Sequence, residues 1–332
     1  MARRFIRYEA FHLKRVGYSM SDRLILGSRG SELARAQTRS VEEALKGAWP
    51  ELETALQIIS TRGDEKALEL APPVDPRAGR KGLFTGEIER ALKAGKIDVA
   101  VHSAKDLPSE ESQELSVRAV LPRARVEDIL VTKKGGGVNS LAAGATVATG
   151  SVRRRCQMQS IVPGVKVVDL RGNVPTRLRN LAANDWDAVV LARAGLERLG
   201  FDLSGTAFNF EGRKFFHEQL PCDRFLPAGG QGVIALQVRK ADARTCGFVD
   251  QVNHAETYLC LRAEREFLRL LQGDCDSPVG VQATIAEGVM SITAQVFQVG
   301  CVKPRSACAE GLVEAEGAER LAARLLELLN GP

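Results

Sequence analysis

The sequence predicts an α/β protein of three domains, two α/β domains followed by a small α+β domain. Apolar runs of strand type alternate with amphipathic helical stretches in two successive blocks up to about residue 240, which is the pattern of strand–helix–strand units. Beyond about residue 250 this alternation ends. A chain of 332 residues, 44% of them hydrophobic, is long enough to bury two or three cores.

The first block begins at residue 23 and predicts a parallel sheet. An apolar run ends at Gly27, and Ser31 is placed to cap a helix whose apolar residues share one face. A stretch rich in proline, glycine and basic residues at 61–81 predicts a long loop. The predicted elements are strand 24–26, a helix over about 31–48, strand 56–59, helix 83–92 and strand 97–101.

The second block repeats this pattern, and the C-terminal part departs from it. In the second block we expect strands at 129–131, 145–148, 165–168, 188–192 and 233–238, with helices near 152–161 and 174–183. The C-terminal part predicts a helix over about 259–271, strands at 279–286 and 289–299, and a closing helix at 321–329. Adjacent strands beside helices are typical of a separate α+β domain.

Composition excludes several classes of protein. With 26% charged and 44% hydrophobic residues, the chain is not of the disordered or collagen-like type. It contains no run of 18 apolar residues, so we expect no membrane-spanning helix. The seven cysteines form no Cys-x-x-Cys pair and the four histidines no ligand cluster, which predicts free thiols, a reducing cytoplasmic setting and no metal site.

Much of the net charge of +5 lies at the N-terminus. Residues 1–19 contain five Lys and Arg against one Glu, whereas residues 151–179 contain seven Lys and Arg against one Asp. Residues 1–20 are Arg-rich and poor in acids, as organellar transit peptides are, but they are not Ser-rich, and Met20 could be the true start. Organellar targeting, a disordered tail and a later start therefore stay open.

Arginines follow two strands of the second block. A polar turn after residue 148 leads into a helix whose first turn contains Arg153, Arg154 and Arg155, although the helix dipole disfavours cations there. Arg171 and Arg177 follow the next strand. Ligands of open α/β sheets bind at the carboxyl ends of strands, and arginine forks suit carboxylates and phosphates. The sequence therefore predicts an anion site at this edge.

A third polar group follows the strand at 97–101. Ser103, Lys105 and Asp106 stand just before Pro108, which ends the local structure. In one interpretation Asp106 caps a turn and Lys105 is solvated. In the other, Asp106 is ionised among the arginines and stabilises a cationic intermediate. Spacing alone leaves both interpretations open.

Cys275 lies in a polar turn after the long C-terminal helix. Most free cysteines are small buried hydrophobes, whereas a thiol in a loop of Gly, Asp, Ser and Pro is expected to be accessible. The flanking Asp274 and Asp276 should raise its pKa, so we do not expect an unusually fast nucleophile.

Together and in this order, these stretches resemble the signatures of the porphobilinogen deaminase family from about residue 23 to the C-terminus. The chain departs from the usual family pattern at Asp274, where a glycine is common, and at Ala104, where a methionine is common. The matching motifs are Thr61-Arg62-Gly63-Asp64, Lys81-Gly82-Leu83-Phe84, Val101-His102-Ser103-Ala104-Lys105-Asp106, Leu170-Arg171-Gly172-Asn173, Pro227-Ala228-Gly229-Gly230-Gln231-Gly232 and the Gly-x-Cys-x-x-Pro loop at 273–278.

The resemblance implies a transferase, hydroxymethylbilane synthase. Such an enzyme joins four porphobilinogen molecules head to tail into linear hydroxymethylbilane and releases four ammonia molecules, in the biosynthesis of tetrapyrroles such as haem, chlorophyll and corrins. It would carry a dipyrromethane cofactor, made from two porphobilinogen molecules and attached by a thioether to Cys275. Asp106 would be catalytic, because its carboxylate could bond pyrrole N–H groups and stabilise the cation left when the amine departs.

The resemblance also assigns binding residues, which suit the acetate and propionate groups of each pyrrole unit. Cofactor binding is implied for Ser103, Lys105, Asp106, Thr149, Ser151, Arg153, Arg154, Arg171 and Gly172. Substrate binding is implied for Arg29, Arg171, Arg177 and Arg198, and an active-site loop for Asp64 and Lys81.

The implied fold is a monomer of two periplasmic-binding-protein-like α/β domains and a C-terminal α+β domain that carries Cys275. The chain would cross between the first two domains near 121–127 and 226–232. The predicted boundaries are a disordered extension at 1–22, domain 1 at 23–121 plus 232–250, an anion-binding domain 2 at 127–226, and domain 3 at 253–332.

Two other functions compete with this enzyme. A two-lobed protein with anion-binding strand ends could capture an acidic metabolite, but such a protein has no need of a covalent primer at Cys275. The run Arg153 to Arg155 could bind nucleic acid, but 5% aromatic residues and arginines tied to strand ends argue against it. We therefore expect porphobilinogen as the small-molecule partner, without nucleic acid or membrane.

Overall fold

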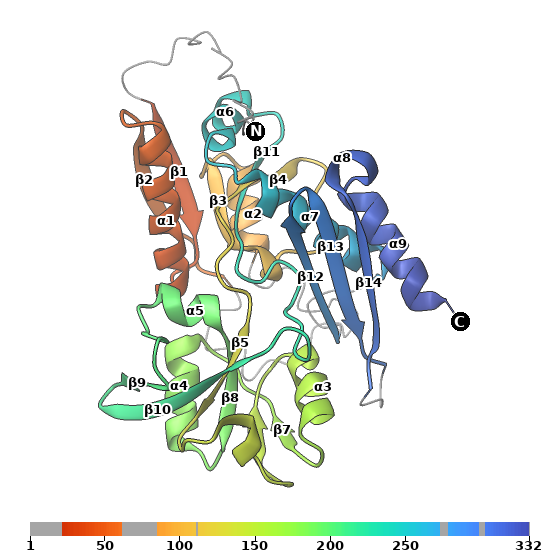
Figure 1. Ribbon diagram of the computed structural model, residues 1–332. Coiled ribbons are helices and arrows are strands. Elements are labelled where there is room, and N and C mark those ends of the chain that lie inside the picture. Colours follow the sequence, from red (N-terminus) through yellow and green to blue (C-terminus); the bar gives the residue numbers. More distant parts are fainter. Residues whose placement is uncertain (1–21, 62–84, 111, 273–277, 299–302, 332) are drawn as a thin grey trace, which may run out of the picture.

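A computed structural model describes residues 22–61, 85–110, 112–272, 278–298 and 303–331. These residues form a first lobe, a second lobe below it and a third unit beside the first lobe, each built on its own β-sheet (Figure 1). In the described ranges, no helix is long and apolar enough to cross a membrane. The predicted N-terminal extension, apart from Asp22, and most of the predicted loop at 61–81 lie outside the described residues.

The first lobe contains a five-stranded sheet in the order β2-β1-β3-β11-β4. Strands β1, β2 and β3 run parallel, as predicted, and Ser31 caps α1 by accepting a hydrogen bond from the backbone N–H of Ala34. The buried face of α1, with Val41 and Leu45, packs into the same core as the strands. The elements are β1 (Arg23–Ser28), α1 (Glu32–Ala48), β2 (Glu53–Ile58), α2 (Gly86–Lys93), β3 (Val99–Ser103), the short 3₁₀ helix η2 (Ala104–Asp106), β4 (Leu115–Val120), β11 (Ile234–Arg239) and α6 (Ala243–Asp250).

The second lobe contains a six-stranded sheet in the order β7-β6-β8-β5-β10-β9. Its predicted helices begin at residues whose side chains cap them, Ser151 for α3 and Asn173 for α4. The hairpin of β9 and β10 extends the sheet beyond the predicted strands. The elements are β5 (Asp128–Thr132), η3 (Gly137–Ser140), β6 (Thr146–Ala148), α3 (Val152–Ile161), β7 (Lys166–Val168), α4 (Val174–Ala183), β8 (Ala188–Ala192), α5 (Arg193–Arg198), β9 (Ala207–Phe210) and β10 (Arg213–Leu220).

The third unit is an antiparallel sheet in the order β12-β13-β14, with two helices on one face. Phe267 of α7 and Leu325 of α9 pack against Ile292 of β13 in one core cluster. The α+β character predicted for this part of the chain is confirmed, and β14 is a strand that the sequence reading did not predict. The elements are α7 (Ala255–Leu270), β12 (Val279–Ala286), β13 (Val289–Val296), β14 (Arg305–Leu312), α8 (Val313–Glu316) and α9 (Ala318–Asn330).

The chain passes between the two lobes twice, at 121–127 and 221–233. In each lobe the strand that follows a crossing, β5 or β11, runs antiparallel to both its neighbours. The prediction of parallel sheets is therefore wrong for these two strands. The reason is that the chain enters each of these strands from the other lobe, so β5 and β11 start at the junction. The strands β3 and β8 end at the junction, so the neighbouring strands run in opposite directions.

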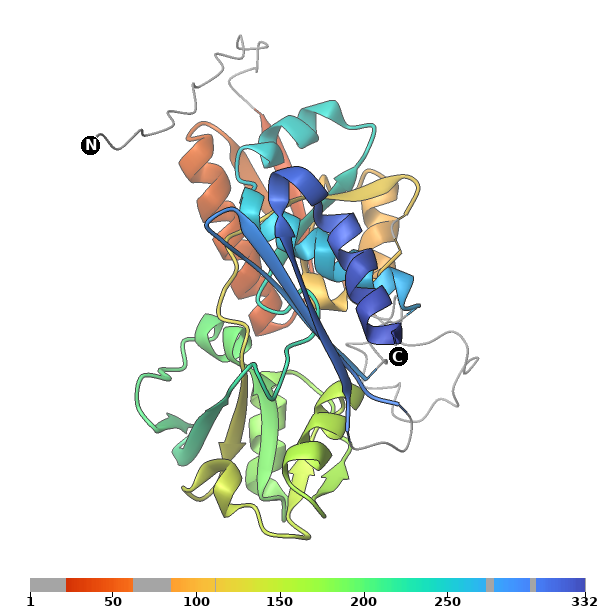
Figure 2. The same ribbon diagram turned by 45° about the vertical axis from the view of Figure 1, so that its right-hand side comes forward.

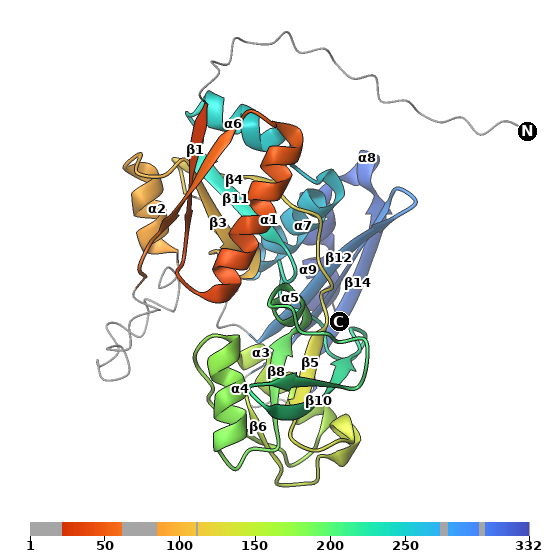
Figure 3. The same cartoon turned by 90° about the vertical axis from the view of Figure 1, so that its left-hand side faces the viewer.

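Contacts at the junction join all three units. The buried Glu264 carboxylate of α7 accepts hydrogen bonds from Arg123 at 2.6 Å in the first crossing and from the Gly230 N–H at 2.7 Å in the second. Gln295 at the end of β13 accepts one from Gln157 of α3 at 3.1 Å, where the third sheet reaches the second lobe (Figure 2). On the other side of the junction, α1 contacts α5 (Figure 3).

Candidate active site

Asp106 lies at the junction, just past the carboxyl end of β3. The strand ends at Ser103, and η2 turns the chain so that Ser103 and Asp106 line one pocket of about 70 Å³. Arg29, at the carboxyl end of the neighbouring strand β1, lines the same pocket. The structure therefore brings together three of the residues that the sequence analysis assigned to the site.

The Asp106 carboxylate is half-buried and has no hydrogen-bond or ion-pair partner among the described residues. It does not cap the turn in which it lies, so the first of the two interpretations of Asp106 is not supported. His102 also lines this pocket, but it is buried and bonded to Gln237 at 3.0 Å, and burial lowers its pKa to about 4. A neutral His102 therefore has a structural role, and the carboxylate that faces the pocket is that of Asp106.

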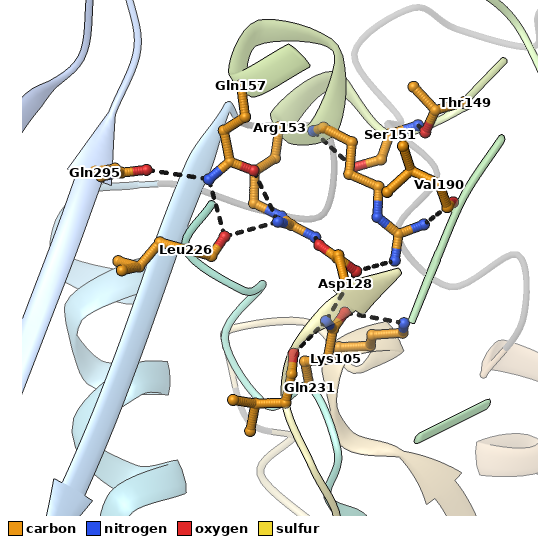
Figure 4. A network of polar contacts seen from close by, with 12 residues as sticks. Lys105, Asp128, Thr149, Ser151, Arg153, Gln157, Val190, Leu226, Gln231 and Gln295 are labelled. Carbon is orange, nitrogen blue, oxygen red and sulfur yellow. Dashed lines mark hydrogen bonds and ion pairs between the residues drawn. The ribbon is translucent and has the colours of Figure 1, made fainter. Parts of the chain in front are cut away.

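Arg153 and Arg154 converge on a buried carboxylate, Asp128, at the start of β5 (Figure 4). Arg154 Nη2 donates to Oδ1 at 2.6 Å and Arg153 Nη2 donates to Oδ2 at 2.8 Å. Gln231, in the second crossing, donates from Nε2 to Oδ1 at 3.0 Å. The anion predicted from the arginine-rich helix start is therefore, in part, a carboxylate of the protein itself.

The two arginines have different further contacts. Arg153 donates from Nη1 to the Leu226 carbonyl at 2.7 Å and to Gln157 at 2.9 Å, which ties α3 to the second crossing. Arg154 donates from Nη1 to the Val190 carbonyl of β8 at 2.9 Å. Within the described ranges, the buried Nε atoms of both arginines have no hydrogen-bond partner. On each guanidinium the buried Nε–H is thus a donor without an acceptor among the described residues.

Electrostatic interactions connect this cluster to Asp106. Burial alone would raise the pKa of Asp128, but Arg153, Arg154 and Lys105 hold it well below its usual range. Burial and then the nearby Arg154 lower the pKa of Lys105 to about 8, against an opposing effect of Asp106. The same two causes lower the pKa of Arg177 to about 10. Arg154 therefore lies within electrostatic range of both Lys105 and Arg177, and Asp106 lies within range of the same two residues.

The start of α4 arranges Arg171, Gly172 and Arg177. Gly172 has φ +100°, and a Cβ there would lie 2.8 Å from Thr176 Cγ2, so the position requires glycine. Its carbonyl accepts a hydrogen bond from Arg177 Nε at 2.7 Å, which holds Arg177 at the junction. Arg171 is exposed and pairs with Asp169 at 3.0 Å. Of the two predicted substrate arginines of this segment, only Arg177 is half-buried near Asp106.

The remaining assigned residues fall into two groups. Thr149 is buried and its Oγ1 accepts a hydrogen bond from the Ser151 N–H at 3.2 Å, so both hydroxyls lie at the start of α3. Arg198 donates to the Gly232 carbonyl at 2.7 Å and does not line the Asp106 pocket. Burial lowers the pKa of Arg198 to about 10. The structure therefore places Arg198 at the second crossing.

Three assigned residues lie outside the described residues, namely Asp64, Lys81 and Cys275. Two important residues were missed. Asp128 directly follows the first crossing and begins an otherwise apolar strand, and an acidic residue at the start of such a strand is the one local signal that could have indicated its role. Gln231 belongs to the Gly229-Gly230-Gln231-Gly232 motif, but nothing in the motif itself indicates a contact of its side chain with Asp128.

The donor set fits a polycarboxylate ligand such as the implied dipyrromethane. Lys105, Arg153, Arg154 and Arg177 supply four positive charges against the two carboxylates of Asp106 and Asp128. Two buried guanidinium Nε–H groups have no acceptor within the described ranges. Buried cations and buried unpaired donors are costly unless an anion compensates them, so the site favours a ligand that brings several acceptors and negative charge.

Comparison with known proteins agrees with this chemistry. A model of the porphobilinogen deaminase dipyrromethane cofactor binding domain matches residues 24–247, and one of the porphobilinogen deaminase C-terminal domain matches residues 258–331. The porphobilinogen deaminase of Moorella thermoacetica is 41% identical over 82% of this chain and 82% of its own. That of Syntrophomonas wolfei is 38% identical over 91% of this chain and 94% of its own.

Solved structures with a similar course of the chain are more distant. The periplasmic VFT2 domain of BvgS from Bordetella pertussis is 15% identical, covers 70% of this chain and 86% of its own, and has a TM-score of 0.41. The methionine binding protein MetQ is 12% identical, covers 71% of this chain and 92% of its own, and has a TM-score of 0.40.

Proposed function

This chain belongs to the porphobilinogen deaminase family, and on that premise we propose that Asp106 is its catalytic residue and that the cations around Asp128 bind the carboxylates of its ligands. The protein is a transferase, hydroxymethylbilane synthase. It joins four porphobilinogen molecules into hydroxymethylbilane with release of ammonia, in tetrapyrrole biosynthesis, and it uses a dipyrromethane cofactor.

One observation carries the role of Asp106: its carboxylate faces a pocket and has no partner among the described residues, while cations of both lobes surround it. A carboxylate in that position can accept hydrogen bonds from pyrrole N–H groups. It can also stabilise the positive charge that develops on the substrate as ammonia leaves. Departure of the amine requires a proton at nitrogen, and Asp106 is placed to hold and deliver one.

The cofactor would be held by residues of both lobes. Ser103, Lys105 and Asp106 of the first lobe would bind it from one side, and Thr149, Ser151, Arg153, Arg154, Arg171 and Gly172 of the second lobe from the other. When bound through a thioether to Cys275, the dipyrromethane supplies the free pyrrole carbon to which the first substrate unit is joined. We assign Arg29, Arg171, Arg177 and Arg198 to the substrate, and Asp64 and Lys81 to the active-site loop.

The three sheets support the domain boundaries predicted from the sequence. We propose that residues 23–121 with 232–250, residues 127–226 and residues 253–332 are three domains, following a separate extension at 1–22. Each proposed domain contains a sheet with its own core cluster. We also propose a monomer that acts in the cytoplasm on porphobilinogen alone, without a nucleic-acid or membrane partner.

The experiment that tests the assignment combines intact mass with turnover. The purified protein should be heavier than its sequence by two pyrrole units, and Cys275→Ser should lose this excess. Asp106→Asn should keep the excess and the wild-type unfolding midpoint but lose turnover by at least about 100-fold, the usual scale for a charge-stabilising or proton-transfer group. An unmodified wild-type chain that forms hydroxymethylbilane would refute the attachment site, and near-normal turnover of Asp106→Asn would refute the role of Asp106.

A further inference from the structure

Thr85 stands immediately before α2, and its hydroxyl has an unusual position. A threonine at this place normally accepts a hydrogen bond from the N–H of the second or third helical residue. Here φ −114° and ψ −28° leave the side chain without a capping bond, and only the Thr85 carbonyl bonds the helix, accepting from the Glu89 N–H at 2.8 Å. The side chain is 2% exposed, and Oγ1 has no hydrogen-bond partner in the described part of the chain.

Thr85 is one of the residues that line the Asp106 pocket, and its neighbours Gln37, Ser103 and Ser31 in that lining are already paired. Gln37 and Ser103 bond each other, with Gln37 Nε2 donating to Ser103 Oγ at 2.9 Å. Ser31 accepts from the Ala34 N–H at 3.3 Å as the cap of α1. A buried hydroxyl that gives up water without a replacement destabilises the fold. Its retention at a pocket wall indicates a partner that arrives with a ligand.

Apart from the Asp106 carboxylate, the charges that line the pocket favour an anionic partner. Two helices, α1 and α2, begin at the pocket wall, and their N-termini carry partial positive charge. Arg29 is another of the residues that line this pocket. A hydroxyl in that field is best oriented with its hydrogen toward the ligand, because a carboxylate offers only acceptors.

We propose that Thr85 Oγ1 donates a hydrogen bond to a carboxylate of the incoming porphobilinogen, beside Arg29. A pocket of about 70 Å³ is well below the roughly 300–1,000 Å³ of sites that enclose a drug-sized ligand, so it receives one acidic arm of the substrate. The pyrrole ring would then lie outside this small pocket, on the side that Asp106 lines. This inference rests on the proposed function of the Asp106 pocket and adds a specific substrate contact to it.

The test compares Thr85→Val with Thr38→Val in the holoenzyme. Valine keeps the shape of threonine and removes the hydroxyl. For Thr85→Val we expect a rise of about tenfold in the KM for porphobilinogen, the effect of losing one hydrogen bond to a charged group, with kcat and cofactor mass unchanged. Because the lost hydroxyl was unpaired, the Tm should stay the same or rise. Thr85→Ser should restore the KM.

Thr38 is the matched control, since its buried hydroxyl donates to the Ala34 carbonyl at 3.0 Å and does not line the pocket. Thr38→Val should lower the Tm and leave the KM unchanged. A wild-type KM in Thr85→Val, with active wild-type enzyme, would overturn the Thr85 contact, and it would mean that water alone satisfies the hydroxyl. An inactive wild-type holoenzyme would instead refute the proposed function, so the two failures can be told apart.

Discussion

Two aspartates at the junction of the lobes have opposite surroundings. Asp128 is fully buried and accepts hydrogen bonds from Arg153, Arg154 and Gln231 at 2.6–3.0 Å. Asp106 is half-buried, and no described residue bonds its carboxylate. Burial of a carboxylate is compensated only by partners of this quality. The pairing of Asp128 therefore indicates a structural anchor, whereas the unpaired Asp106 is available to a ligand.

The anchor also explains how the cations near Asp106 stay in place. Arg153 and Arg154 come from α3, Asp128 from the start of β5, and Gln231 from the second crossing. Lys105, next to Asp106, donates to Gln231 Oε1 at 3.3 Å. One buried carboxylate thus gathers cations of the second lobe at the position where the first lobe presents Asp106, the carboxylate that we propose to be catalytic. We therefore expect Asp128 to act as a positioning residue, through these neighbours.

The largest effect that this comparison predicts is on folding. Asp128→Asn removes the charge that two buried guanidinium groups share, and breaking a buried ion pair on one side costs about 3–5 kcal/mol. We expect this loss in the free energy of unfolding from urea denaturation, together with a reduced fraction of chains that carry the cofactor by intact mass. Asp106→Asn is the matched control and should unfold like the wild type. Equal stability of the two variants would contradict the distinction between an anchor and a catalytic carboxylate.

Lys105 provides a pH-dependent test on the Asp106 side. Burial and Arg154 lower its pKa from 10.5 to about 8, so the folded apoenzyme loses this charge as pH rises through about 8, well before the unfolded chain does. Between about pH 8 and 10.5 the unfolded chain binds more protons, so this group makes the fold more stable as pH rises in that window. Carboxylate binding should change in the opposite sense, because a neutral amine no longer attracts it.

We therefore expect the rate at which apoenzyme acquires the dipyrromethane, followed by intact mass, to fall about tenfold from pH 7 to pH 9. Lys105→Arg keeps its charge throughout this range, so its rate should stay flat. The comparison of the two proteins separates Lys105 from every other group that titrates there. A parallel decline in wild type and Lys105→Arg would show that Lys105 is not the group responsible.

Local patterns in the sequence predicted much of the fold. The Ser31 cap and the apolar face of α1 are local properties of the chain, and so are the bounds of α3 and α4. Strands β9 and β10 were missed because β10 begins with Arg213 and Lys214 and lacks a simple apolar alternation. The antiparallel direction of β5 and β11 depends on which lobe the chain has just left, and no local pattern records that.

In the site, too, features that depend on local sequence could be predicted, and features that depend on distant parts of the chain could not. The strand ends that carry Ser103, Asp106 and Arg153 could be located from the sequence, because carboxyl ends of neighbouring strands share an edge. The pairing of Arg153 and Arg154 with Asp128 could not be, since 25 residues separate Arg153 from Asp128 and the bond depends on a strand that enters from the other lobe. The unpaired hydroxyl of Thr85 depends on a single departure from ordinary capping geometry.

The smallest predicted effect concerns Arg179, which lies two residues after Arg177 in α4. Arg177 is half-buried near Asp106, whereas Arg179 is exposed, pairs with Glu211 at 2.7 Å and lies over the ring of Phe210. Exposed ion pairs contribute little, because water and salt screen them. Arg179→Gln should therefore match the wild type in urea midpoint, cofactor mass and KM for porphobilinogen. A raised KM in this variant would show that the exposed side of α4 also contributes to ligand binding. Burial would then no longer distinguish the arginines that bind ligand from those that only lie at the surface.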